Sequence, residues 1–405
     1  MRALGRVLML AISAAALNVP GMLGCSAIPA THVATYTCPS TPHGDIAAAA
    51  RRENAPIVVI TLDGVRWQEI FEGTDPEQLK TSRHVRPMSA RQLLPNVYRW
   101  FFDRGVALGD NRNPVFASGP AYLSLPGYRE MFSGHPSSCQ NNACPWSEEA
   151  TFVDELMESE MLAPEDVAIA TSWGPMAHAV TRRPCGAVIS AGRTGGASRE
   201  AFRVNRRASE ILRAASDAAA YPGWGDYRPD RFTAALALHY LREVAPRLLV
   251  VGLGDTDEYA HRDNYEKYIA SIRRFDAFIG DLFRSLERMR ERRGGGAGGE
   301  ASVFVLTDHG RNTGFAHHGF GDPASSRVWF LAYGPRILGV NTRRDASTPM
   351  RLGDLAPTLR AALHLPAHDT FELAQRSLVA FDDSTDLLAH LKDPQINRRS
   401  DPETH

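Results

Sequence analysis

The residues best suited to chemistry in this chain are carboxylates and histidines that follow apolar runs. Asp308 and His309 come directly after the apolar run 301–306, and His317 and His318 lie eight and nine residues beyond His309. An apolar run of this length predicts a buried strand, so Asp308 and His309 are expected where a strand gives way to a loop. A carboxylate oxygen beside an imidazole nitrogen is a zinc-type pair of ligands.

Two further segments offer the same types of side chain. Asp63 directly follows the apolar run 57–62, which also predicts a strand. Asp257 and His261 are four residues apart, a spacing that puts both side chains on one face of a helix. Asp255 is an alternative to Asp257, but only Asp257 has the four-residue spacing to His261.

A serine adds a hydroxyl group to this set. Ser124 lies in the segment 118–128, which glycine and proline punctuate. The carboxylates and histidines are about what two divalent cations need at roughly three protein ligands each. Two cations about 4 Å apart can hold the attacking and leaving oxygens of an in-line displacement at phosphorus. A serine oxygen held by one of them would be an alkoxide, a stronger nucleophile than the free hydroxyl.

Each segment also has an ordinary structural interpretation. Asp63 and Gly64 could form a simple turn. Asp257 and His261 could cap a helix, and His318 could be a hydrogen-bonded loop residue. Because all of these residues fall at predicted strand ends, one shared site is the favoured interpretation.

Apolar periodicity predicts the elements that would position these residues. Strands are expected at 56–62, 106–108, 167–170, 248–251, 302–307 and 328–333. Helices are expected at 90–104, 151–159, 198–218, 231–244, 265–290 and 352–365. The alternation of strands and helices predicts an α/β fold whose largely parallel central sheet is covered by helices on both faces.

Length and charge limit the class of protein. The 405 residues can form one large α/β domain or two ordinary ones. The net charge of -1 gives no global attraction to nucleic acid, and arginine pairs such as Arg206-Arg207 are typical of solvated helix faces, so no nucleic-acid partner is expected.

The N-terminus is predicted to be a targeting segment. Arg2 and Arg6 precede the apolar stretch 7–17, which is too short to span a membrane and is typical of a secretory signal. The sequence up to Cys25 resembles a bacterial lipobox, with Cys25 as the lipidated residue and a possible membrane attachment. Simple cleavage after Ala27 or Ala30 is the open alternative.

Domain boundaries follow from composition. Residues 1–25 are the signal segment, 26–54 a linker or extended arm, 55–380 a single catalytic domain, and 381–405 a peripheral polar tail. Substrate recognition is expected in 139–245. This segment holds aromatic residues that could line a pocket but are expected more often to be core: Trp146, Trp173, Tyr221, Trp224 and Tyr227.

Export would permit disulfides. Cys139 and Cys144 are five residues apart in a polar turn, where a short bridge is favoured over a metal site because no C-x-x-C spacing or histidine is present. Whether Cys38 pairs with Cys185 is left open by the sequence.

The ordered motifs resemble the alkaline phosphatase superfamily, and most closely its type I phosphodiesterases and nucleotide pyrophosphatases. The matching segments span 56 to about 365. They are Ile57 to Gly64, Ser124 to Tyr128 with Phe132 to Gly134, Asp257 with His261, Thr307 to Gly310, His318 with Gly319, and Asp354 to Leu359.

The resemblance implies two metal sites. One cation would be held by Asp63, Ser124, Asp308 and His309, and the other by Asp257, His261 and His318, with His317 as an alternative to His318. Ser124 would attack phosphorus to form a phosphoseryl intermediate, which water activated at the second cation would hydrolyse. Asn142 or Asn141 falls near the place of an asparagine that holds a non-bridging oxygen.

Some residues depart from the family's patterns. The phosphodiesterases usually carry a threonine nucleophile and Asn-His after the proline, where this chain has Ser124 and Gly127-Tyr128. Sulfatases of the superfamily have an arginine where Tyr128 stands, and this difference argues against maturation of Ser124 to formylglycine.

We therefore expect an exported hydrolase of phosphoric esters, located in the periplasm or cell envelope, with an outer-membrane lipoprotein as the form that lipidation of Cys25 would give. Its two divalent cations would be Zn²⁺ in the first place, with Mn²⁺ or iron as alternatives. A sulfatase or phosphotransferase on the same scaffold is the second hypothesis. A non-catalytic lipoprotein of the same fold is the third.

Overall fold

A computed structural model describes residues 55–193, 202, 205–218, 226–294, 300–340, 347–365 and 376–381. The predicted signal segment, the linker and the tail beyond residue 381 lie outside the described residues, as do Cys25 and Cys38. Within the described part, seven strands form a central sheet in the order β2-β9-β7-β1-β6-β4-β5. Their bounds are β1 Ile57–Leu62, β2 Val106–Leu108, β4 Val167–Thr171, β5 Val188–Ala191, β6 Leu248–Leu253, β7 Ser302–Leu306 and β9 Phe330–Tyr333.

The middle of the sheet is parallel. Strand β1 pairs in parallel with β6 on one side and with β7 on the other, with Ile60 opposite Val251 and Val305. Every residue of β1 is buried, which explains its unbroken apolar sequence, because a strand covered on both faces has no solvent side. At one edge of the described sheet, β9 pairs antiparallel with both β7 and β2. The largely parallel sheet predicted from the sequence is therefore confirmed.

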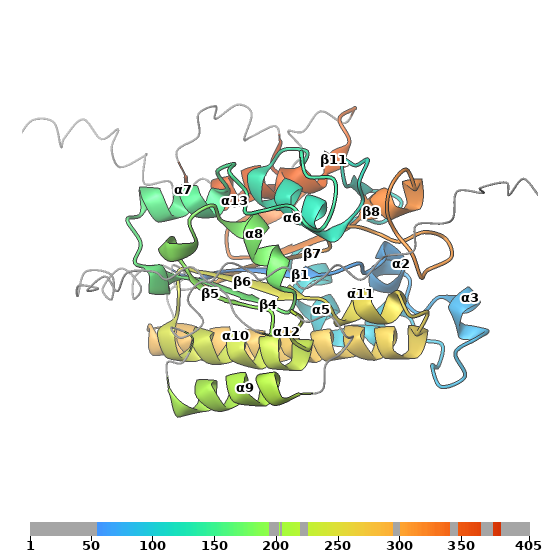
Figure 1. Ribbon diagram of the computed structural model, residues 1–405, viewed down its shortest axis with the longest axis horizontal. Coiled ribbons are helices and arrows are strands. Elements are labelled where there is room, and N and C mark those ends of the chain that lie inside the picture. Colours follow the sequence, from blue (N-terminus) through green and yellow to red (C-terminus); the bar gives the residue numbers. More distant parts are fainter. Residues whose placement is uncertain are drawn as a thin grey trace, which may run out of the picture. The chain divides into compact units, whose positions relative to one another are not determined.

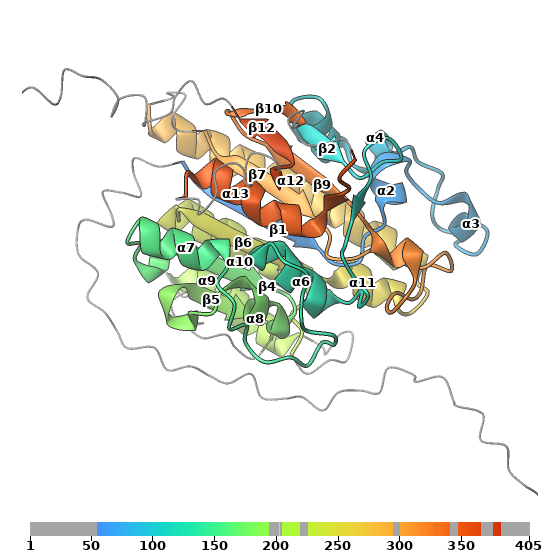
Figure 2. The same ribbon diagram turned by 90° about the horizontal axis from the view of Figure 1, so that it is seen from above.

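Helices cover both faces of this sheet, as Figures 1 and 2 show. On one face lie α9 (Arg206–Asp217), α10 (Asp230–Val244) and the long α12 (Tyr265–Arg292). On the other lie α6 (Ser124–Ser133), α7 (Phe152–Ser159), α8 (Ala177–Val180) and α13 (Leu355–Leu363). Two separate clusters of buried apolar side chains fill the two interfaces.

Smaller elements complete the described part. A two-stranded sheet pairs β10 with β12, and a three-stranded sheet has the order β11-β3-β8. Their bounds, with those of the short helices, are α2 Trp67–Phe71, α3 Pro76–Leu79, α4 Ala90–Leu93, α5 Pro95–Val97, α11 Asp255–Ala260, β3 Val115–Phe116, β8 Arg327–Val328, β10 Ile337–Val340, β11 Met350–Arg351 and β12 Val379–Phe381. Within the described ranges, no helix is long and apolar enough to cross a membrane.

Two predicted elements were wrong in detail. The helix expected at 90–104 is broken, because Pro95 cannot donate the next helical hydrogen bond; α4 ends at Leu93, and a π-helical turn follows α5. The strand expected at 328–333 is divided between two sheets at Trp329, whose buried indole donates to Val65 O at 2.8 Å. Strand β5, which the sequence analysis did not include, lies at the edge of the sheet.

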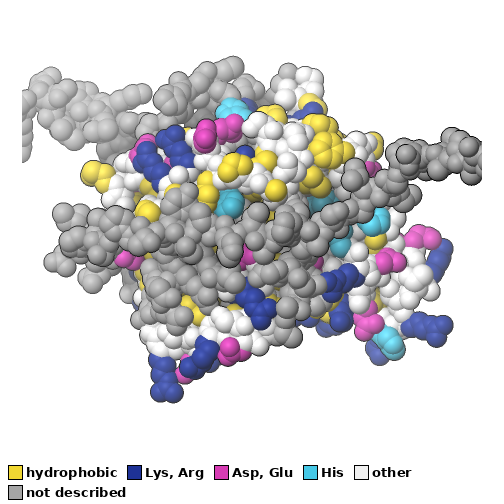
Figure 3. All heavy atoms as spheres, in the orientation of Figure 1, with side chains coloured by type: hydrophobic (Ala, Val, Ile, Leu, Met, Phe, Trp, Pro, Cys, Tyr) yellow, Lys and Arg dark blue, Asp and Glu magenta, His cyan; other side chains and the backbone are white. Residues whose placement is uncertain are grey.

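The surface agrees with the interpretation of the arginine pairs. Arg206 and Arg207 are exposed on α9, and Arg182 and Arg183 are exposed as well. On the face drawn in Figure 3, basic side chains are scattered and several lie beside acidic ones. The bridge between Cys139 and Cys144 is confirmed. The pairing of Cys38 with Cys185 cannot be followed, since Cys38 is outside the described residues.

Candidate metal centre

The predicted ligands meet at one edge of the sheet. Asp63 follows the last residue of β1, and Asp308 lies two residues beyond the end of β7. Asp257 lies in α11, which begins two residues after β6 ends. Because these three strands are parallel neighbours, their carboxyl ends deliver the three carboxylates to one place, which is where open α/β sheets bind ligands.

The first group consists of four side chains. His309 Nε2 lies 3.4 Å from Asp63 Oδ1 and 3.4 Å from Asp308 Oδ2. Ser124 Oγ lies 3.3 Å from His309 Nε2 and 3.5 Å from Asp63 Oδ1. All four residues are buried. These are the residues that the resemblance assigns to one cation, and the structure brings them together.

The spacing of the first group fits a tetrahedral cation. Ligands at about 2.0–2.2 Å from a tetrahedral zinc ion are separated from one another by roughly 3.3–3.6 Å, the spacing found here. In the described part of the chain, Asp308 Oδ2 is a buried oxygen with no hydrogen-bond partner. A buried carboxylate oxygen without a donor is costly unless a positive charge faces it, so this atom is suited to coordinate a cation.

Electrostatics of the group lead to the same conclusion. Burial, together with the neighbouring charge of Asp63, raises the pKa of Asp308 well above its usual value. Burial opposes the charged form of His309, but the Asp308 and Asp63 carboxylates outweigh it and raise the pKa of His309 to about 9. Two buried carboxylates this close need a positive charge, and without a cation they recruit protons instead.

Backbone carbonyls set the tautomers of two histidines. His309 Nδ1 lies 2.9 Å from Gly310 O, and His318 Nδ1 lies 2.8 Å from Tyr122 O. A carbonyl oxygen can only accept, so both Nδ1 atoms carry a hydrogen, and in the neutral form of each ring Nε2 is the nitrogen with the lone pair. This arrangement is usual for histidines that ligate a metal.

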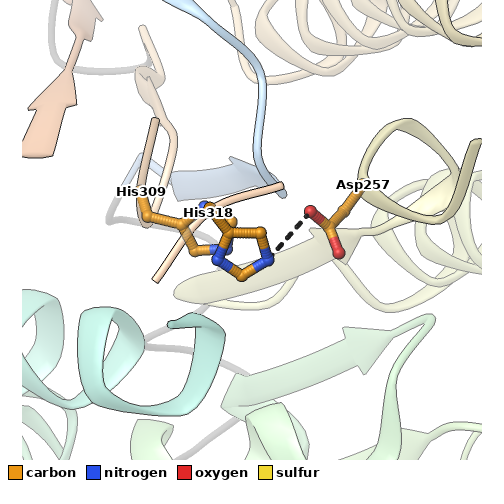
Figure 4. A group of neighbouring side chains, drawn as sticks. All are labelled: Asp257, His309 and His318. Atoms are coloured by element: carbon orange, nitrogen blue, oxygen red, sulfur yellow. Dashed lines mark ion pairs between the residues drawn. The ribbon is translucent and has the colours of Figure 1, made fainter. Parts of the chain in front are cut away.

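The second group lies against the first. His261 Nε2 is 3.1 Å from Asp257 Oδ2 and 2.9 Å from His318 Nε2, while Asp257 Oδ1 is 3.6 Å from His318 Nε2. The rings of His309 and His318 stack with centroids 3.7 Å apart, so one imidazole of each group touches the other (Figure 4). Asp257, His309 and His318 also lie close enough to share a cation.

The structure separates the alternatives left by the sequence. The carboxylate of Asp255 accepts from Tyr227 OH at 2.8 Å and from the amide of Asp230 at 3.2 Å, so it points away from both histidines. His317 is exposed, whereas the side chain of His318 is 4% exposed and lies in the second group.

Asn142 lies beside the serine and Asn141 does not. The Asn142 side-chain oxygen accepts from the amide of Leu125 at 3.0 Å, at the first turn of α6 and next to Ser124. Asn141 is exposed, and its side chain accepts from Ala143 N at 2.8 Å within the turn that the 139–144 disulfide closes.

The resemblance implies that Asn142 donates to a non-bridging oxygen, so replacing it by alanine is expected to lower kcat for an ester substrate by about 100- to 1,000-fold, the usual cost of one lost donor to a transition-state oxygen. Asn141→Ala is the matched control, because it removes the same amide one residue away, and it should stay within about twofold of the wild type. Steady-state kinetics of both variants check this, and equal losses in the two would contradict the role of Asn142.

Tyr128 is a site residue that the sequence analysis did not assign. Its hydroxyl donates to Asp63 Oδ2 at 2.8 Å, which leaves Asp63 Oδ1 facing His309 and Ser124. The preceding Gly127 is also explained, since a Cβ there would lie 2.4 Å from Asp308 O. The departure from the phosphodiesterase pattern thus lets α6 approach β7 and orients a ligand.

Tyr128→Phe is expected to weaken binding of the first cation by about tenfold, as is common when a partner of a ligand is removed. It should also lower the free energy of unfolding by about 1 kcal/mol, the value of one hydrogen bond. Zinc titration and thermal melting of the variant test both effects; unaltered zinc affinity would show that Tyr128 does not orient Asp63.

A reciprocal pair of carboxylates holds α11 in place. Asp230 accepts from the amides of Gly254 at 2.8 Å and Asp255 at 2.9 Å, at the start of α11. Asp255 in turn accepts from the amide of Asp230, the first residue of α10. Because each carboxylate satisfies the amino end of the other helix, the pair fixes the position of Asp257, two residues after Asp255 in the same first turn of α11.

The described aromatic residues of 139–245 are either buried in the core or partly buried against it. Tyr227 is 2% exposed and belongs to the core, as the favoured interpretation had it. Trp146 and Trp173 are half-buried and pack against the second core cluster. Tyr221 and Trp224 lie outside the described residues.

Comparison with known proteins gives similarities of structure only. No model of a protein family matches the chain, and no curated protein matches it. The lipoteichoic acid synthase LtaP from Listeria monocytogenes is similar at a TM-score of 0.47 and 11% identity, over 84% of this chain and 78% of that chain. A TAB5 alkaline phosphatase mutant is similar at a TM-score of 0.44 and 11% identity, over 78% of this chain and 99% of that chain. A 2-O GAG sulfatase is similar at a TM-score of 0.45 and 13% identity, over 78% of this chain and 72% of that chain. At these identities the likeness is one of fold alone.

Proposed function

We propose that this chain is an alkaline phosphatase-like hydrolase of phosphoric esters, acting through Ser124 beside two divalent cations. The observation that supports the proposal best is the first group of ligands, in which Asp63 and His309 lie at ligand-to-ligand distances from the serine oxygen and Asp308 lies at the same distance from His309. An ordinary buried polar cluster would satisfy Asp308 Oδ2 with a donor, and none is present among the described residues.

The chain's own residues prepare the serine for attack. Ser124 Oγ donates towards Asp63 Oδ1, so its proton is directed to a carboxylate and a lone pair is left for phosphorus. Ser124 is the first residue of α6, so the positive end of the helix dipole lies beside its hydroxyl and favours the negative charge of a phosphoryl group. Bound cations would supply the charge that lowers the pKa of the serine hydroxyl and stabilises the transition state.

Two displacements complete the proposed reaction. In the first, a bond forms between Ser124 Oγ and phosphorus while the bond to the leaving oxygen breaks, and the leaving oxygen takes up a proton. In the second, water forms a bond to phosphorus and Ser124 leaves with a proton restored. The His261 side chain is 31% exposed, so the second group offers the side from which water can enter.

A phosphoryl group is favoured over a sulfuryl group by the residue at 128. The resemblance to sulfatases would place an arginine there, and this chain has Tyr128, which is engaged with Asp63. The unmodified serine is therefore proposed as the nucleophile, whether the ester is a phosphomonoester or a phosphodiester.

Parallel assays test the proposed chemistry. Purified protein loaded with Zn²⁺, Mn²⁺ or Fe²⁺ is offered an aryl phosphate, a bis-aryl phosphate and an aryl sulfate, with metal content measured on the same sample. Turnover of one or both phosphate esters with about two equivalents of metal supports the proposal. Turnover of the sulfate alone would replace it by the sulfatase hypothesis, and no turnover with bound metal would favour a non-catalytic binding protein.

We further propose that the protein acts outside the cytoplasm, in the periplasm or cell envelope, on the basis of the N-terminal signal pattern and the disulfide between Cys139 and Cys144. Attachment through Cys25 belongs to this proposal. Fractionation of cells producing the full chain, with Cys25→Ser as the comparison, tests both parts.

A further inference from the structure

We infer that Arg311 is a positioning residue for the second cation group, joining Asp257 to the loop that carries His318. The inference deepens the proposed function, because it concerns the same site. Arg311 stands three residues after Asp308, and its side chain is fully buried.

All three nitrogens of the Arg311 guanidinium have partners. Nη1 donates to Asp257 Oδ1, Nε donates to Phe315 O at 2.5 Å, and Nη2 donates to Ala316 O at 2.9 Å. One rigid, planar group therefore connects α11 with two carbonyls that lie just ahead of His318. Lysine carries all its donors on one nitrogen, so it cannot reach the carboxylate and both carbonyls at the same time.

The loop from 311 to 318 depends on these contacts. Asn312 N donates to His317 O at 2.8 Å, which closes the loop, and Phe315 has a left-handed φ of 73°. The Phe315 ring is buried edge-on against Tyr265 and Tyr268 of α12. Without the arginine, two carbonyls at the turn would lose their charged donor, and the loop that carries His318 would lose its attachment to α11.

Arg311 also selects which oxygen of Asp257 remains for a cation. Since Nη1 holds Oδ1, Oδ2 is the atom directed to His261 Nε2 at 3.1 Å. The guanidinium charge lies beside a group with one carboxylate, whereas the first group has two carboxylates and no ion pair with an arginine in the part of the chain that the structure describes. We therefore expect the first group to fill before the second.

Arg311 could affect the second cation in two ways, by orienting its ligands or by repelling its charge, and removal of Arg311 would change the cation's affinity in opposite directions. Loss of orientation weakens the second cation, while loss of a nearby positive charge strengthens it. The two carbonyls and the carboxylate that Arg311 holds make orientation the larger effect, because the group must keep three ligand atoms within a cation's reach.

The test is a titration of metal-free protein with Co²⁺, followed by visible absorption and by calorimetry. Wild-type protein should bind two equivalents in separate steps. Arg311→Lys should bind the first with the wild-type spectrum and affinity, and the second about 10- to 100-fold more weakly, the usual effect of losing a partner that orients a ligand. A general loss of stability would not produce this selectivity.

Arg247→Lys is the matched control. Arg247 also holds a carboxylate and a backbone carbonyl, those of Glu160 and Ala55, but it lies directly before β6 and so at the opposite end of the strand from α11. Both equivalents should bind normally to this variant.

Arg311→Met serves as the second variant, since it removes the charge as well and keeps an unbranched side chain. A second equivalent bound by Arg311→Met as tightly as by the wild type, or more tightly, would overturn the inference in favour of simple repulsion. Loss of both equivalents from both variants, with Arg247→Lys unaffected, would overturn it too. Wild-type protein that binds two equivalents but cleaves no ester would contradict the proposed function and leave the role of Arg311 intact.

Discussion

Ser124→Ala is expected to lower kcat for an aryl phosphate by about 10⁴-fold or more, as removal of a nucleophile does in other hydrolases. The first cation should still bind within about tenfold of the wild-type affinity, because Asp63, Asp308 and His309 remain as ligands. Steady-state kinetics and zinc content, both measured on one preparation, distinguish loss of the nucleophile from loss of the metal.

Ser133→Ala is the control for this change. Ser133 is the last residue of the same helix and is also buried, and its hydroxyl hydrogen-bonds with the backbone of His135, donating to His135 O at 3.3 Å. Its replacement should leave kcat within about twofold of the wild type. Wild-type turnover by Ser124→Ala would exclude the serine mechanism whatever the metal content.

Asp308→Asn is expected to abolish the stabilisation that zinc gives at the first group. In wild-type protein treated with a chelator, added zinc at about 1,000 times its dissociation constant should stabilise the fold by roughly 4 kcal/mol and raise Tm by several degrees. The variant lacks one of the two carboxylates of the first group, so the same zinc concentration should raise its Tm much less than that of the wild type, through the second group alone. Activity should fall with it.

The metal-free proteins are expected to behave in the opposite way. Without a cation, burial and the neighbouring charge of Asp63 make the ionised form of Asp308 costly, and a neutral amide in its place removes that cost. Metal-free Asp308→Asn should therefore melt at or above the Tm of metal-free wild type. Asp281→Asn, which changes a half-exposed carboxylate on α12, should keep the full response to zinc. A normal zinc response in Asp308→Asn would show that the first group does not hold the cation.

Much of this site could be predicted from the sequence, because its ligands follow strands that are buried on both faces. Such strands are apolar throughout, so a charged residue at their end stands out, as Asp63 and Asp308 do. The helical spacing of Asp257 and His261 was equally informative: α11 ends at Ala260, and His261 caps it.

Other residues gave no such signal. Arg311 follows a glycine in a polar segment, where an arginine is usually solvent-exposed, and its burial depends on a loop closing over α11. Tyr128 could not be assigned because its partner, Asp63, lies 65 residues away. Strand β5 has only four residues, directly behind a turn at Pro184–Gly186, so its apolar run was too short to stand out.

The exchange of hydrogen bonds between Asp230 and Asp255 has a consequence for the order of assembly. Neither α10 nor α11 has a satisfied amino end until the two are docked, although their carboxylates are 25 residues apart in the chain. Docking is therefore cooperative, and His261 and Asp257 cannot reach their final places on a half-formed sheet. Metal capture at the second group would then follow the closure of this helix pair, which makes it a late event in folding.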